Sequence, residues 1–170
     1  MATYAVGADV STHAVHLALV GSEAVEITRV IDLQQHPIRW LGETKAFLTS
    51  LRERHWYVEP WPLALYLEAP WARAEKGIQT ALEIHRIAAF VEAAAWFAGL
   101  QVERVAIPTW KTAIFGRNLP SAQSKRAAIE YVRRVFGVET RDNNLADAIA
   151  IGAYGQRQQQ LTKRLAEARA

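Results

Sequence analysis

The chain has 170 residues, of which 51% are hydrophobic and 22% are charged, and its formal net charge is +3. These values predict one globular domain over residues 1–170 and exclude a disordered chain. The absence of cysteine excludes a disulfide scaffold, a thiolate zinc site and a cysteine nucleophile. No apolar stretch reaches the length of about 20 residues that a membrane span needs, and we expect no signal peptide.

Short apolar runs with tight connections open the chain and predict an antiparallel meander of three strands. Helices and strands then alternate along the sequence. We expect strands over residues 4–9, 14–20, 25–33, 63–67 and 102–107, and helices over 37–54, 74–100, 109–115, 121–136 and 143–168, with about 158–170 as a polar helix end. This order predicts an α/β fold, a mixed five-stranded sheet flanked by helices, as in the ribonuclease H-like fold.

Two acidic residues come at the ends of apolar strands. Asp9 closes the first strand, and Glu68 follows Leu67 in a strand that reads as central. A buried carboxylate without a partner costs several kcal/mol, so each needs an amide, an arginine or a metal ion. For Asp9 alone, a turn-capping role beside Ser11 is the alternative interpretation.

A third acidic residue lies in an alanine-rich helical segment. Asn144 and Asp147 share one face of this helix at a spacing of three residues. The small neighbours of Asp147 allow the helix to approach the sheet closely, which would point its carboxylate at the sheet. The alternative is an aspartate that faces solvent.

Together, these side chains predict a site for hard cations at one sheet edge. Oxygen ligands without sulfur or clustered histidine favour Mg²⁺, with Mn²⁺ as a substitute. Two such ions about 4 Å apart support in-line cleavage of a phosphodiester. Residues 111–134 hold six basic side chains and one acidic one, which indicates either a polyanion partner or a solvated helix surface.

Four segments in this order resemble the RuvC family of Holliday-junction resolvases, including its phage-borne members. They are residues 6–11 (Val-Gly-Ala-Asp-Val-Ser), 65–71 (Leu-Tyr-Leu-Glu-Ala-Pro-Trp), 107–111 (Ile-Pro-Thr-Trp-Lys) with 122–125 (Ala-Gln-Ser-Lys), and 144–151 (Asn-Leu-Ala-Asp-Ala-Ile-Ala-Ile). The resemblance implies a homodimeric, metal-dependent endonuclease with two ions per site, which cuts four-way DNA junctions by paired symmetric nicks. It also implies a cytoplasmic protein of a bacterial cell or its phage.

The resemblance assigns roles to individual residues. It implies that Asp9, Glu68 and Asp147 bind metal, that Lys111 and Lys125 face phosphates or act in catalysis, and that Trp71 stacks on an unpaired base. Stacking of this kind contributes about 1–3 kcal/mol, although Trp71 could equally pack beneath the next helix. The neighbouring basic residues Arg73 and Arg126 are expected to contact DNA as well.

The resemblance also makes residues 74–100 the dimer interface, where Ile78, Leu82, Ile87 and Val91 could equally be core.

One position departs from the family pattern. Asn144 stands where the family usually has an aspartate or histidine, and an uncharged amide holds metal less tightly. Asn143 or Asp142 could take its place, and Asn144 could be natural or an inactivating substitution. This departure leaves open a junction-binding protein with impaired catalysis. A nuclease for flaps or forks on the same fold is a further alternative. The five histidines are interpreted as structural.

Overall fold

The computed structural model describes residues 3–34, 36–55, 63–70, 77–117 and 119–169. Its elements follow the predicted order of three strands, then alternating helices and strands, then helices. The strands are β1 (Ala5–Val10), β2 (Ala14–Val20), β3 (Val25–Asp32), β4 (Ala64–Glu68) and β5 (Gln101–Val105). The helices are α1 (Pro37–His55), α2 (Ile78–Phe97), α3 (Ile107–Phe115), α4 (Ser121–Phe136) and α5 (Asn143–Glu167).

The strands form one mixed sheet in the order β3-β2-β1-β4-β5. β1 pairs antiparallel with β2, and β2 pairs antiparallel with β3, which confirms the predicted meander. β4 is parallel to β1 and to β5. β1 and β4 are therefore neighbours that end at the same edge of the sheet, and this brings Asp9 and Glu68 to that edge.

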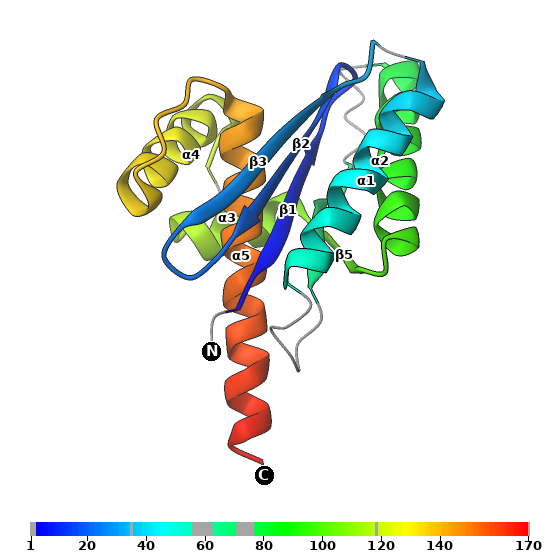
Figure 1. Cartoon of the computed structure of the whole chain (residues 1–170). Coiled ribbons are helices and arrows are strands. Elements are labelled where there is room, and N and C mark those ends of the chain that lie inside the picture. Colours follow the sequence, from blue (N-terminus) through cyan, green and yellow to red (C-terminus); the bar gives the residue numbers. More distant parts are fainter. Residues whose placement is uncertain (1–2, 35, 56–62, 71–76, 118, 170) are drawn as a thin grey trace.

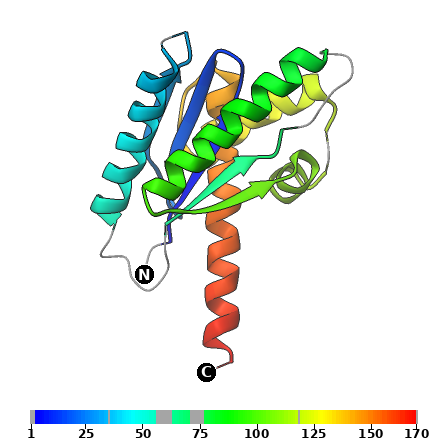
Figure 2. The ribbon, with the colours of Figure 1, turned by 90° about the vertical axis from the view of Figure 1, so that its right-hand side faces the viewer.

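Helices cover both faces of the sheet (Figures 1 and 2). One apolar cluster joins the sheet to α3, α4 and α5, and the other joins it to α1 and α2. Side chains alternate between these clusters along β1, because successive residues of a strand point to opposite faces. Ala5 packs on the α5 side and Val6 on the α1 side. Asp9 lies four residues after Ala5 in β1, so its side chain points to the same face, toward α5.

The close approach of α5 to the sheet depends on glycine. A Cβ atom on Gly7 of β1 would overlap the backbone of Ala148 and Gly152 in α5. The helix can therefore lie almost directly on the strand, as the small residues around Asp147 predict. This contact sets the distance between the acidic residues of β1 and those of the first turns of α5.

Several predicted boundaries differ from the structure by a few residues, and the starts of α3 and α2 illustrate why. α3 begins at Ile107 rather than at residue 109, because Pro108 fits in the first turn of a helix, where no N–H is needed. Ile107 therefore belongs to the helix and not to the fifth strand. The predicted helix start at residue 74 lies outside the described residues. Within them, α2 begins at Ile78 after Gly77, whose φ of 78° suits glycine. No helix in the described part of the chain is long and apolar enough to cross a membrane.

Candidate functional site

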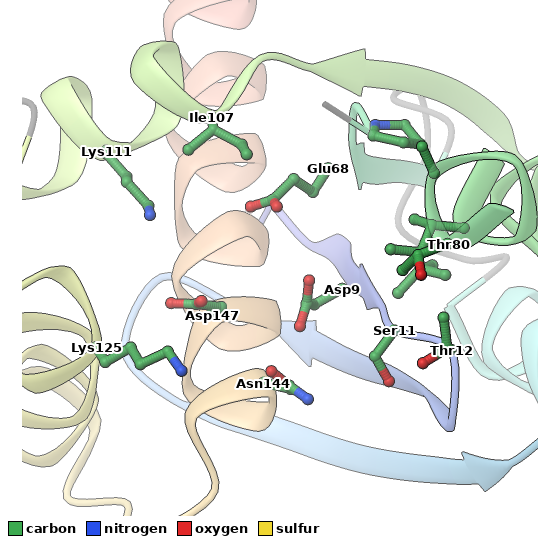
Figure 3. Close-up of a pocket in the computed structure, with 14 residues that line it drawn as sticks. Asp9, Ser11, Thr12, Glu68, Thr80, Ile107, Lys111, Lys125, Asn144 and Asp147 are labelled. Atoms are coloured by element: carbon green, nitrogen blue, oxygen red, sulfur yellow. The ribbon is translucent and has the colours of Figure 1, made fainter. Parts of the chain in front are cut away.

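One pocket of about 470 Å³ lies where β1 and β4 end beside α5 (Figure 3). Its walls come from segments that are far apart in the sequence but meet in the fold. The lining includes all of the predicted metal ligands and both predicted lysines, namely Asp9, Glu68, Asn144, Asp147, Lys111 and Lys125. The structure thus brings the predicted acidic residues and lysines to the walls of one pocket.

Asp9 is a buried carboxylate in this pocket. Burial raises its pKa well above the usual value, and the nearby carboxylates of Glu68 and Asp147 raise it further, while the backbone N–H of Val10 lowers it. The adjoining turn does not use Asp9. Ser11 closes that turn instead, since its hydroxyl accepts from the Ala14 N–H at 3.0 Å. The turn-capping interpretation of Asp9 is therefore wrong.

Asp147 points from α5 toward the sheet rather than into solvent. Its Oδ1 atom is buried and has no hydrogen-bond partner among the described residues. Burial and the charge of Glu68 raise its pKa to about 7, against the opposing effect of Lys111 and Lys125. Figure 3 shows these lysines beside Asp147. Additional positive charge in the pocket would favour the ionised form of Asp147.

The residues at the start of α5 have distinct roles. Asp142 is the helix N-cap, and its Oδ1 accepts from the backbone N–H of Asn144 at 2.9 Å and of Leu145 at 3.2 Å. Its Oδ2 lies 3.1 Å from Nε2 of the buried His16 on β2. Asp142 is thus engaged in capping, whereas Asn144 lines the pocket and Asn143 does not. Of the three residues considered for the fourth position, Asn144 is the one that lines the pocket.

Glu68 accepts a hydrogen bond from a residue to which the sequence assigned no role in the site. The indole Nε1–H of Trp110 donates to Glu68 Oε2 at 3.0 Å. Trp110 is completely buried in α3. The next residue, Lys111, places its Nζ 5.2 Å from the centroid of the Trp110 ring, within the range of a cation–π contact.

The donor set of the pocket fits a hard divalent cation. It offers three carboxylates and one amide oxygen, and Asp147 Oδ1 is a buried acceptor with no hydrogen bond from the described residues. In the described part of the chain, no three Asp, Glu, His or Cys side chains are gathered closely enough to hold a metal ion as they lie. Asp9, Glu68 and Asp147 lie near enough to raise one another's pKa values, so a bound cation would neutralise their mutual repulsion and favour a closer arrangement.

The structure describes only one of the three other predicted DNA contacts. Trp71 and Arg73 fall outside the described residues. Arg126 is exposed on α4 and does not line the pocket, although its neighbour Lys125 does. Conversely, the pocket includes Thr80 from the first turn of α2, which no sequence pattern indicated.

No family model and no curated protein matches the sequence. Solved structures do match. The structure of T. thermophilus RuvC in complex with a Holliday junction substrate superimposes with a TM-score of 0.74 and 20% identity, over 94% of this chain and 96% of that one. A second Thermus thermophilus RuvC structure gives a TM-score of 0.68 and 19% identity over the same shares of the two chains. This chain therefore has the ribonuclease H-like fold of the RuvC structures.

Proposed function

We propose that this protein is a divalent-metal-dependent endonuclease that resolves four-way DNA junctions by paired symmetric nicks. The observation that carries this proposal is one pocket in which Asp9, Glu68 and Asp147 converge beside Lys111 and Lys125. The similarity in fold between this chain and a RuvC in complex with a Holliday junction substrate supports the choice of substrate.

In this proposal, the acidic side chains of the pocket bind metal and the basic ones contact phosphate. Asp9, Glu68, Asp147 and Asn144 would hold Mg²⁺ or Mn²⁺, two ions per site, and the bound ions would activate water and stabilise the leaving oxygen. The lysines carry the opposite charge on the side of Asp147, where they can neutralise a phosphate. An acidic centre flanked by basic side chains suits a phosphodiester backbone.

The experiment that tests this function is a cleavage assay on a labelled four-way junction. Linear duplex and flap DNA serve as controls, each with Mg²⁺, with Mn²⁺ and with EDTA. We expect nicks on two opposed strands of the junction in the presence of metal only. Cutting of flaps in preference to junctions would indicate the alternative nuclease, and cutting in EDTA would contradict a metal-dependent mechanism.

A homodimer is part of the proposal, and an exposed apolar surface on α2 supports it. Ile78, Leu82, Trp96 and Phe97 are all exposed, with Trp96 at 74%, whereas Ile87 and Val91 of the same helix are core residues. The sequence left open whether Ile78, Leu82, Ile87 and Val91 belong to the core or to an interface. The structure buries the last two and leaves the first two exposed. Solvated aromatic residues in this number are typical of a protein interface.

Leu82→Glu is expected to convert the dimer to a monomer, because it places a charge in the middle of this apolar surface. Sedimentation equilibrium should show the mass fall from two chains to one. Leu161→Glu is the matched control, since Leu161 is 53% exposed on α5 and Leu82 is 60% exposed. A wild-type chain that is monomeric at all concentrations tested would contradict the dimer.

A second candidate function follows from Asn144. This residue lines the pocket and contributes an oxygen without a charge, so metal affinity is expected to be low. A protein of this kind would bind junctions and cut them slowly or not at all. The cleavage assay separates the two functions, because a binder retains the junction without nicks under any divalent ion.

Asn144→Asp is expected to lower the Mg²⁺ concentration for half-maximal cleavage by about tenfold, because ligand charge tunes cation affinity. A Mg²⁺ titration of the nicking rate measures the effect. Asn143→Asp adds the same charge one residue away on a side chain that does not line the pocket, and it should change the titration little. Identical titrations for wild type and Asn144→Asp would show that Asn144 does not limit metal binding.

A further inference from the structure

Trp110 stands out among the core residues because its polar atom is aimed at a candidate ligand. The ring is completely buried and packs edge-on against Phe115 at a centroid distance of 5.7 Å. A phenylalanine or leucine would fill the same apolar space without a polar group. A buried indole N–H needs an acceptor, and here the acceptor is Glu68 Oε2 at 3.0 Å.

This hydrogen bond is compatible with a role of Glu68 in the pocket. An ionised carboxylate has two oxygens with about four lone-pair sites, and Trp110 occupies one of them. Glu68 lines the pocket as well as contacting α3. The indole can therefore fix the rotation of the carboxylate without removing it from the pocket.

The Trp110 ring also lies next to a basic side chain of the pocket. Lys111 Nζ lies over the Trp110 ring, 5.2 Å from its centroid, and Lys111 lines the pocket too. Phe115, which packs edge-on against Trp110, also packs edge-on against Tyr131. One rigid residue thus touches an acidic and a basic side chain of the pocket.

We propose that Trp110 is a positioning residue that orients the Glu68 carboxylate for a divalent cation. This inference rests on the proposed function. Groups that hydrogen-bond to a metal ligand from outside the coordination shell orient it, and their loss typically lowers metal affinity 10–100-fold. The indole N–H would have this role here, with the surrounding core supplying its rigidity.

The test is Mn²⁺ binding to the protein without DNA, followed by electron paramagnetic resonance. Trp110→Phe keeps an aromatic ring beside Phe115 and Lys111 but removes the N–H, and we expect Mn²⁺ affinity to fall about tenfold. Trp40→Phe is the matched control, because Trp40 is buried in the other apolar cluster, edge-on to Phe90 at 5.8 Å. Its Mn²⁺ affinity should equal that of wild type.

A second measurement uses the wild-type chain alone and does not depend on the folding of a variant. In ¹H–¹⁵N spectra, the Trp110 indole signal should shift when Mg²⁺ saturates the protein, whereas the Trp40 indole signal should stay in place. An unmoved Trp110 signal, or equal Mn²⁺ affinity in Trp110→Phe and wild type, would overturn the positioning role alone. Failure of the wild-type chain to bind either ion would overturn the proposed function together with this inference.

Discussion

Asp9→Asn will reduce the rate of junction cleavage by at least about a thousandfold while the protein stays folded. The substitution keeps the shape of the side chain and removes its charge. Metal ions contribute several kcal/mol to stabilising the transition state of phosphodiester cleavage, and about 4 kcal/mol corresponds to a thousandfold. Single-turnover nicking of a labelled junction in excess Mg²⁺ measures the loss.

Junction binding separates this effect from damage to the fold. Asp9 is buried beside two other carboxylates that repel it, so the neutral variant should bind DNA at least as tightly as wild type in EDTA. Asp32→Asn is the control, because it makes the same change at an exposed position at the end of β3. A nicking rate for Asp9→Asn within threefold of the wild-type rate would exclude Asp9 as a ligand.

Asp147→Asn will make the protein more stable at pH 8, even though it removes a site residue. The pKa of Asp147 is raised from 3.8 to about 7 by burial and by Glu68. A shift of this size corresponds to about 4 kcal/mol, and we expect about half of it because water reaches part of the side chain. The melting temperature should rise by about 6 °C, as measured by calorimetry without metal.

The pH dependence of this gain has a definite sign. A carboxyl whose pKa is higher in the folded state binds its proton more tightly there, so the stability of wild type falls as pH rises from about 4 to about 7. The advantage of Asp147→Asn should therefore vanish near pH 4 and be complete above pH 7. Mg²⁺ should stabilise wild type more than the variant at pH 8. An advantage that is the same at pH 4 and pH 8 would refute the electrostatic cause.

The fold and the acidic centre could be predicted because both depend on local patterns. Apolar runs and short links predict β1 to β3, and the parallel placement of β4 next to β1 follows from that order. Asp9 and Glu68 were identifiable because charged residues at the ends of apolar strands are costly without partners. Asp147 was identifiable because Ala146, Ala148 and Ala150 let this part of α5 approach the sheet closely.

The supporting contacts could not be predicted because they join residues that are distant in the sequence. Trp110 lies 42 residues from Glu68, and in an apolar segment its indole reads as an ordinary core side chain. His16 and Asp142 are 126 residues apart, and only the register that places His16 opposite Asp9 brings them near one another. The role of Gly7 could not be predicted either, because it depends on the position of α5, which leaves no room for a Cβ atom there.

The most direct test of the metal centre is a crystal of the wild-type protein grown with Mn²⁺ and measured for anomalous scattering. Manganese is expected between the carboxylates of Asp9, Glu68 and Asp147, with Asn144 as a further oxygen ligand. The same data set from Asp9→Asn should show a weaker peak or none. A wild-type map without anomalous density in this pocket at millimolar Mn²⁺, or with manganese bound only elsewhere, would contradict a metal-dependent nuclease centre at this site.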